Sequence, residues 1–336
     1  MNYRKLGNTD LMVSEIGFGC QSIGGGLYYK NDRESLKTLL EAFDLGVNFF
    51  DTSDHYSQGE SEKLIGKAFK GKRDKIIIGT KAGTLYTPSG SVILKLRLLL
   101  RPISKFLQPM KISFHLMRAK QKRFDFSFNY LIQAVEKSLR RLKTDYIDLF
   151  QLHKPSKEIL ERGDFIEPLE KLKQEGKIRY HGISTAENEH ALICFKYQQI
   201  SSIQVMINLL DKKWAKEILN LATEKGVGII ARNPRAHGHL TDELGDIMAE
   251  TYAKNKNEFE LKKEKAAKYK FLVNSNRTLT QAALRYVLSL QGISTTIPRA
   301  VNRTQLKENL DTLNSPELTE DELNKIHSIE NLISIK

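Results

Sequence analysis

The hydrophobic and polar positions of the chain repeat one local pattern. A run with helical spacing of apolar residues ends in glycine, and a short apolar segment follows at once, as in FDLGVNFFDTS, KQEGKIRYHGIST, TEKGVGIIARN and SLQGISTTIPR. Glycine adopts without steric cost the left-handed conformation that ends many helices. We expect this conformation at four glycines: Gly46, Gly176, Gly226 and Gly292. The pattern therefore predicts a regular alternation of helices and strands.

The predicted strands are continuous apolar runs, which is typical of parallel strands buried on both faces. Eight of them alternate with helical segments, at residues 13–20, 47–53, 76–81, 145–153, 178–185, 202–207, 226–233 and 293–298. Eight strand–helix units in 336 residues predict an α/β fold, a (β/α)8 TIM barrel. No shift of composition separates two domains, so residues 1–336 are expected to form a single domain. An open doubly wound sheet is the alternative, and it is disfavoured because no GxGxxG follows the first strand.

Two long segments do not fit the repeating unit. One spans about 84–125, after the third strand, and the other spans about 240–276, after the seventh. In a barrel both would leave the carboxyl ends of strands, where active sites lie. They are therefore expected to form lids or substrate loops.

The composition narrows the class of protein. Apolar residues make up 40% and charged residues 28% of the chain, as in ordinary globular proteins. The N-terminal segment has no apolar stretch of the kind found in secretory signals, so a cytoplasmic protein is expected. Only Cys20 and Cys194 are present, without metal-ligand spacing, so neither a disulfide framework nor a metal site is predicted.

The net charge of +13 is concentrated in one segment. Residues 84–124 contain nine lysines and arginines and no acidic residue. Three interpretations stay open: a substrate lid with its basic side chains in water, capture of an anionic substrate, and peripheral docking of residues 91–124 on an anionic membrane. Sequence-specific binding of nucleic acid is disfavoured because no recognition module is present.

Polar side chains stand at the carboxyl ends of three successive predicted strands. Asp51 ends the second strand, with Tyr56 close behind, Lys81 ends the third and His153 the fourth. Reduction of a carbonyl needs a proton donor for the nascent alkoxide, and a phenol with a pKa of about 10 needs help to act at neutral pH. A nearby ammonium lowers the pKa of a phenol, a carboxylate orients that ammonium, and an imidazole donates to the substrate oxygen. The set therefore predicts carbonyl chemistry, with a Schiff base on Lys81 as an alternative.

The same residues lie in motifs that resemble the aldo-keto reductase superfamily. The segment YRKLGNTDLMVSEIGFGC resembles its N-terminal hairpin and first strand, and FFDTSDHYSQGESEKLIGKAF resembles its Asp–Tyr signature. YIDLFQLH and GISTTIPRAVNRTQLKENL resemble its histidine strand and its C-terminal cofactor segment. The resemblance implies an N-terminal β-hairpin on a (β/α)8 barrel and a nicotinamide-dependent reductase. It also implies that Asp51, Tyr56, Lys81 and His153 form the catalytic tetrad.

The resemblance also implies a cofactor site. Ser184, Thr185 and Gln204 would bind the nicotinamide carboxamide, Arg232 would stack on the ring, and Asn233 to Gly238 would face the pyrophosphate. The full expected set is Gly19, Cys20, Asp51, Ser184, Thr185, Gln204, Arg232, Asn233, Pro234, Arg235, Gly238, Pro298, Arg299, Ala300, Arg303, Gln305, Glu308 and Asn309.

The choice of cofactor follows from the adenosine end of that set. A guanidinium is well shaped for a phosphate, so Arg299 and Arg303 favour NADPH over NADH, although Gln305 stands where strict NADPH users often have arginine. The expected activity is interconversion of an aldehyde or ketone, including sugar-derived or anionic ones, and its alcohol. A regulatory or scaffolding protein that binds cofactor with little turnover is the alternative from another class.

Overall fold

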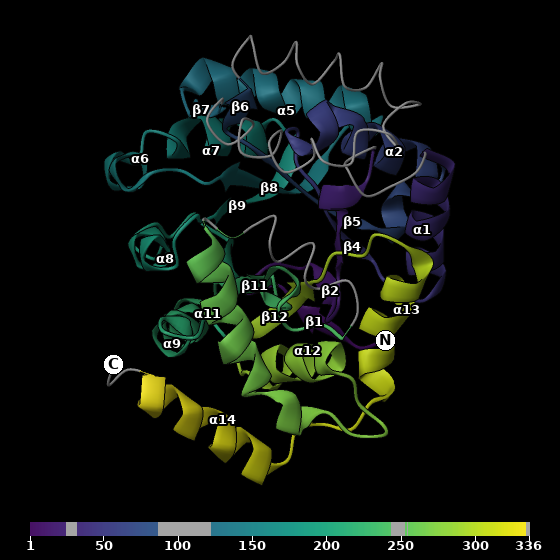
Figure 1. The fold of residues 1–336 in the computed structure, drawn as a ribbon. Coiled ribbons are helices and arrows are strands. Elements are labelled where there is room, and N and C mark those ends of the chain that lie inside the picture. The colour runs from purple at the N-terminus through teal and green to yellow at the C-terminus, as the bar shows by residue number, and fades with distance from the viewer. Residues whose placement is uncertain (25–31, 87–121, 243–252, 254, 334–336) are drawn as a thin grey trace.

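The computed structural model describes residues 1–24, 32–86, 122–242, 253 and 255–333 (Figure 1). Most of the predicted basic segment lies outside this part of the chain, so the lid, anionic-substrate and membrane interpretations stay predictions. Among the described residues, no helix is both long enough and apolar enough to cross a membrane.

Eight parallel strands form the predicted barrel. In spatial order the sheet runs β12–β11–β10–β9–β8–β5–β4–β3, and its neighbours pair in parallel. The strands are β3 (Phe18–Gly19), β4 (Phe49–Asp51), β5 (Ile77–Ala82), β8 (Ile147–His153), β9 (Ile178–Ser184), β10 (Ser202–Met206), β11 (Gly228–Arg232) and β12 (Ile293–Ile297). The two edges meet, because Gly17 N donates to Thr296 O at 2.8 Å and Thr296 N donates to Glu15 O at 3.0 Å. The prediction of a (β/α)8 barrel is confirmed.

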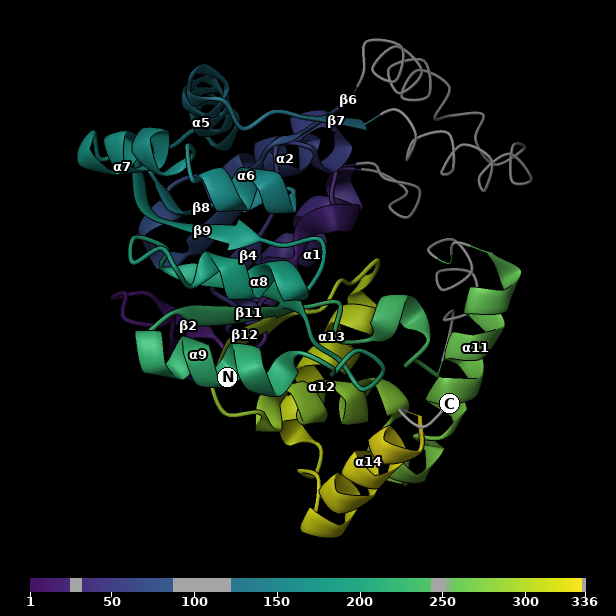
Figure 2. The ribbon, with the colours of Figure 1, turned by 90° about the vertical axis from the view of Figure 1, so that its left-hand side faces the viewer.

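Helices surround the sheet (Figures 1 and 2). They are α1 (Asp32–Asp44), α2 (Glu60–Ala68), α5 (Phe128–Leu142), α6 (Lys157–Arg162), α7 (Ile166–Gln174), α8 (Glu189–Cys194), α9 (Ala215–Lys225), α12 (Leu279–Ser289), α13 (Arg303–Asp311) and α14 (Glu320–Ile333). The four glycines expected to end helices all have positive φ: 93° at Gly46, 71° at Gly176, 68° at Gly226 and 92° at Gly292. The apolar pattern and these helix stops thus determine the order of the elements.

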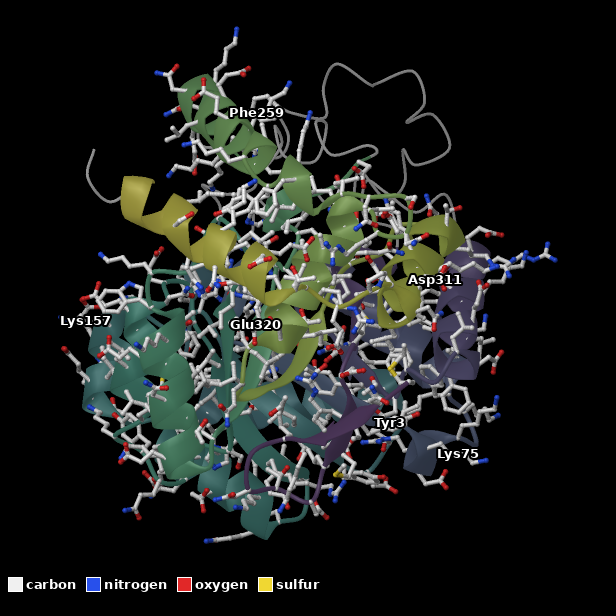
Figure 3. The ribbon with its side chains drawn as sticks, turned by 90° about the horizontal axis from the view of Figure 1, so that it is seen from below. Tyr3, Lys75, Lys157, Phe259, Asp311 and Glu320 are labelled. Atoms are coloured by element: carbon white, nitrogen blue, oxygen red, sulfur yellow. The ribbon has the colours of Figure 1, made fainter. Side chains whose placement is uncertain are left out.

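An N-terminal hairpin closes the amino end of the barrel, as the family resemblance implied. Strands β1 (Tyr3–Lys5) and β2 (Met12–Ser14) pair antiparallel. Their connection buries Leu6 and Leu11 in the apolar cluster that includes Phe49, Leu149 and Ile230. In Figure 3, Tyr3 is labelled on this hairpin in the lower part of the picture. The opposite, carboxyl end of the strands stays open to the loops that carry the polar residues.

The two long segments predicted after the third and seventh strands include regular secondary structure where the structure describes them. Strands β6 (Thr84–Tyr86) and β7 (Lys122–Phe124) pair antiparallel where the basic segment leaves and re-enters the described chain. The segment after β11 contains α11 (Lys256–Ala267), whose N-cap Asn255 accepts a hydrogen bond from Glu258 N at 2.9 Å. Phe259 on α11 and Tyr3 on the hairpin lie at opposite sides of the view in Figure 3.

Candidate active site

Lys81 and Asp51 form a buried ion pair at the carboxyl ends of β5 and β4. The two strands are parallel neighbours in which Asp51 pairs with Gly79, so Lys81, two residues further on, reaches the carboxylate. Lys81 Nζ lies 2.7 Å from each Asp51 oxygen and 2.7 Å from Thr52 O. Burial lowers the pKa of Lys81, and the Asp51 carboxylate opposes this effect. Since all three ammonium protons have acceptors, the structure disfavours the Schiff-base alternative, which needs a neutral, accessible amine.

Tyr56 lies beside this ion pair, at the start of a short 3₁₀ turn, η2 (Tyr56–Gly59). Lys81 Nζ is 5.2 Å from the centroid of the Tyr56 ring. The His153 ring meets the same phenol edge-on, with centroids 5.9 Å apart and planes at 84°. The structure therefore brings the four predicted catalytic residues together at one end of the barrel.

Two residues next to Tyr56 were not predicted as part of the site. Ser53 Oγ lies 3.2 Å from His153 Nδ1. Asp54 accepts a hydrogen bond from Tyr130 Oη at 3.3 Å, which ties the loop to α5. Burial, reinforced by the Glu62 carboxylate, raises the pKa of Asp54 to about 7. Their only sequence signal is their place between Asp51 and Tyr56.

The expected carboxamide-binding residues form a buried chain of hydrogen bonds. Ser184 Oγ donates to Gln204 Oε1 at 2.8 Å, and Gln204 Nε2 donates to Asp51 Oδ1 at 2.8 Å. Thr185 Oγ1 is buried and has no partner among the residues that the structure describes. The chain joins β9 and β10 to the Lys81–Asp51 pair, so Gln204 also orients the carboxylate.

Arg232 is attached to the end of β9. Its Nη2 donates to Thr185 O and Ala186 O, both at 3.0 Å, while its buried Nε has no partner within the described chain. Burial lowers the pKa of Arg232. The guanidinium is thus held in place through Nη2, while its buried Nε–H has no partner among the described residues.

The segment after β11 has a constrained backbone. Asn233, Ala236 and His237 have left-handed φ values of 57°, 47° and 60°, and Gly238 has 109°. Asn233 Oδ1 accepts from His237 N at 2.7 Å, which stabilises the turn, and Pro234 is buried in it. The backbone that was expected to face a pyrophosphate is therefore a compact turn.

This turn carries positive charge. Burial and the neighbouring Arg299 lower the pKa of Arg235 to about 10. Burial and a group of cations lower the pKa of His237 to about 3: Arg232, Lys262, Arg299 and Lys154. Arg235 donates to Arg299 O, which joins the turn to the segment after β12. An electropositive region of this kind attracts phosphates.

The remaining residues of the expected cofactor set divide into two groups. Gly19 bridges to Arg299, and its N donates to Pro298 O at 3.2 Å; a Cβ at Gly19 would lie only 2.9 Å from Ile297 O. Asn309 Nδ2 donates to Arg299 O at 3.3 Å, and Asn309 Oδ1 has no partner among described residues. Ala300 and Cys20 are buried, and burial raises the pKa of the Cys20 thiol.

The second group is bound elsewhere. Arg303 forms an ion pair with Glu41 of α1, with Nη2 2.9 Å from Oε1. Gln305 Oε1 accepts from Val301 N at 3.1 Å, and Glu308 accepts from Thr278 Oγ1 at 3.1 Å. Arg303 therefore lies against α1. Arg299, which bridges to Gly19 at the carboxyl end of β3, is the arginine of this segment that lies at the barrel opening.

The residues present fit a nicotinamide dinucleotide. Among the described residues, buried polar atoms without a partner are found on Thr185 after β9, on Arg232 at the end of β11 and on Asn309 of α13. A buried donor or acceptor without a partner is costly, so these atoms suit a polar ligand. A closed barrel with this set of groups defines an NAD(P)H-dependent oxidoreductase.

The chain belongs to the aldo/keto reductase family, whose model matches residues 15–331. It is 34% identical over 331 residues to the uncharacterized oxidoreductase YqkF of Bacillus subtilis, covering 98% of this chain and 96% of that one. It is 30% identical over 245 residues to an NADH-specific methylglyoxal reductase of Escherichia coli, covering 71% and 69%. The holo form of aldo-keto reductase AKR11C1 from Bacillus halodurans superposes with a TM-score of 0.75 at 31% identity, covering 98% and 96%. The family expected from the sequence motifs is confirmed.

Proposed function

We propose that this protein reduces a small aldehyde or ketone to an alcohol, or catalyses the reverse reaction, with NADPH as the preferred cofactor. The observation that carries the proposal is the Lys81 ammonium, held on Asp51 and placed 5.2 Å from the Tyr56 ring. When bound, the nicotinamide supplies hydride to the carbonyl carbon.

The proton that the carbonyl oxygen needs comes from the chain's own residues. Tyr56 Oη donates it to the carbonyl oxygen as negative charge develops there. Lys81 stabilises the phenolate that remains, because a cation in a buried site interacts strongly with a nearby anion. Asp51, itself held by Gln204, fixes Lys81. His153 donates a hydrogen bond to the same oxygen and positions the carbonyl.

The preference for NADPH rests on Arg299 and on the positive charge around it. The cations that depress the pKa of His237 include Arg299, so the region near the segment after β12 is electropositive. A 2′-phosphate carries about two negative charges near neutral pH and gains from such a region, whereas a 2′-hydroxyl gains little. The same charge makes an anionic carbonyl compound a suitable substrate class.

A Tyr56→Phe substitution tests the catalytic assignment. We expect kcat to fall at least about 10³-fold with a broad aldehyde panel, because the proton donor is lost. The Kd of NADPH should change by less than about two-fold, since the phenol oxygen is not part of the proposed cofactor site. Tyr180→Phe is the matched control, because its hydroxyl contacts Asp10 at the opposite end of the barrel.

The outcomes separate the hypotheses. Undiminished kcat in Tyr56→Phe would contradict the assignment, and absence of turnover in the unsubstituted protein would favour the scaffolding alternative. Titrations with both cofactors test the preference, which we expect to favour NADPH by at least about ten-fold; equal affinities would contradict it.

A further inference from the structure

The turn that follows Tyr56 has three left-handed residues in a row. Ser57, Gln58 and Gly59 have φ values of 50°, 57° and 87°. The conformation is costly for the two L-residues, so contacts from other parts of the chain must hold it. One such contact is the hydrogen bond from Ser57 Oγ to Ile23 O at 3.2 Å. The position of the Tyr56 phenol therefore depends on the contacts that hold this turn.

Arg141 of α5 contacts the end of the turn. A Cβ at Gly59 would lie 2.6 Å from Arg141 Cδ and 2.8 Å from Arg141 Nε, so the glycine backbone packs directly on this side chain. Helix α5 is itself close against α2, because a Cβ at Gly66 would lie only 2.4 Å from Leu142 O. The turn thus rests on a side chain from a helix that is packed tightly against α2.

Glu62 fixes Arg141 in this position. The Glu62 side chain is fully buried in the first turn of α2, and its Oε2 accepts a hydrogen bond from Arg141 Nε at 2.5 Å. Its other oxygen, Oε1, accepts from Thr80 Oγ1 at 2.6 Å. Thr80 directly precedes Lys81 on β5. One buried carboxylate therefore connects the turn that carries Tyr56 to the strand that carries Lys81.

We infer that Arg141 and Glu62 are positioning residues that fix the distance between the Tyr56 phenol and the Lys81 ammonium. The inference rests on the proposed function, in which this distance determines how strongly the ammonium stabilises the phenolate. Arg141 acts through the turn and Glu62 through the strand, so neither role needs a contact with substrate. A buried pair of this kind also contributes to stability, and the test therefore includes a similar pair at the other end of the barrel.

Arg73→Met is the matched control for Arg141→Met. Arg73 Nη2 lies 2.6 Å from Asp148 Oδ2, and 19% of the Arg73 side chain is exposed, against 21% for Arg141. Each variant removes an arginine from a buried carboxylate, so we expect Tm to fall in both. Only Arg141→Met should lower kcat, by about 10- to 100-fold, because small displacements of reacting groups are costly. The Kd of NADPH should stay within about two-fold in both variants, and the KM of the best aldehyde of the panel within about three-fold.

The double variant Glu62→Gln/Arg141→Met separates positioning from the effect of an unpaired buried charge. Glu62 raises and Arg141 lowers the pKa of the nearby Asp54, and the double variant removes both influences. We expect most of the lost Tm to return, because no unpaired carboxylate is left at this site. The kcat should stay at least about 10-fold low, because the side chain under the turn is no longer anchored. If Arg141→Met does not fold, the double variant supplies the comparison of kcat.

A Tyr56→Phe background shows whether the effect passes through the phenol. In that background Arg141→Met should change the residual kcat less than about two-fold, because the group that it positions is absent.

Three results would each overturn the inference: an equal loss of kcat in Arg73→Met, full kcat in the double variant, or the whole loss repeated in the Tyr56→Phe background. Unchanged kcat in Arg141→Met would overturn it too. Parallel assays distinguish this failure from failure of the proposed function. If Tyr56→Phe loses activity and Arg141→Met does not, only the positioning role is wrong; if Tyr56→Phe keeps full activity, the proposed function is wrong.

Discussion

The two ends of the barrel differ in how completely their buried charged and polar groups are hydrogen-bonded by the protein itself. At the amino end, Asp148 of β8 accepts hydrogen bonds from Arg73 at 2.6 Å, Arg179 at 2.9 Å and the backbone N of Ile78 at 2.9 Å. Arg179 also pairs with Asp10 beside the N-terminal hairpin. The carboxylate is thus surrounded by donors from the protein itself, which is what stability requires.

At the carboxyl end the Lys81–Asp51 pair is equally close, but the groups around it are not all satisfied. Thr185 Oγ1, Arg232 Nε and Asn309 Oδ1 are buried without partners in the described part of the chain. Natural proteins seldom keep such atoms without a reason, and binding a polar ligand is one. The contrast between the fully satisfied Asp148 carboxylate and the unpartnered atoms near Lys81 agrees with the general division of this fold into a stabilising face and a reactive face.

The two ends of the barrel also differ in which residues have a left-handed backbone conformation. Four helices that end at the amino face are followed by glycines with positive φ, Gly46, Gly176, Gly226 and Gly292, and α5 is followed there by Lys143. Non-glycine residues with positive φ gather after strands at the carboxyl face: Ser57, Gln58, Lys154, Asn233, Ala236 and His237. Such conformations cost about 1–2 kcal/mol for L-residues and are concentrated at functional sites. At the carboxyl face, non-glycine residues therefore occupy left-handed positions at which glycine would be less strained.

The largest expected effect is that of Lys81→Met. Loss of the ammonium should reduce kcat at least about 10³-fold and leave Asp51 buried without its counter-charge, which lowers the free energy of unfolding by about 3 kcal/mol. Steady-state kinetics and urea titration measure the two effects.

The double variant Asp51→Asn/Lys81→Met separates these effects. Removing both charges should restore most of the stability and none of the activity. If the double variant regains turnover, the Lys81–Asp51 pair has only a structural role, and the contrast between the two ends disappears.

Asp148→Asn tests the amino end. Two arginines lose their shared carboxylate, so the free energy of unfolding should fall by about 2–3 kcal/mol, while kcat and KM of the folded protein stay within about two-fold. Glu161→Gln is the control: its exposed pair with Lys157, 3.7 Å apart, should contribute less than about 0.5 kcal/mol. A changed kcat in Asp148→Asn would show that the ends are coupled.

The sequence alone predicts part of the difference between the two ends of the barrel. Neighbouring parallel strands end at the same face, so the order of apolar runs was enough to place Asp51, Lys81 and His153 together. The glycine that follows each helical run likewise predicted four left-handed helix ends correctly.

The partners of individual side chains could not be predicted. Arg303, which was predicted to bind a phosphate, pairs in the structure with Glu41, which is 262 residues away in the sequence. The contact of Ser53 with His153 depends on the path of the chain between β4 and η2, which has no hydrophobic pattern. Such partners are set by three-dimensional packing and leave no periodic signal.

The smallest predicted effect compares two left-handed residues of matched φ, Gln58 at 57° after Tyr56 and Lys143 at 56° after α5. Glycine at either position relieves the same backbone strain, so both Gln58→Gly and Lys143→Gly should stabilise the fold by about 0.5–1 kcal/mol, raising Tm by a few degrees. Only Gln58→Gly loosens the turn that carries the phenol, so only there should kcat fall, by about two- to five-fold. Calorimetry and steady-state kinetics on the pair measure this. Equal kcat in the two variants would mean that the left-handed residues at the carboxyl face do not serve catalysis, and the backbone contrast would then reflect the lengths of the loops alone.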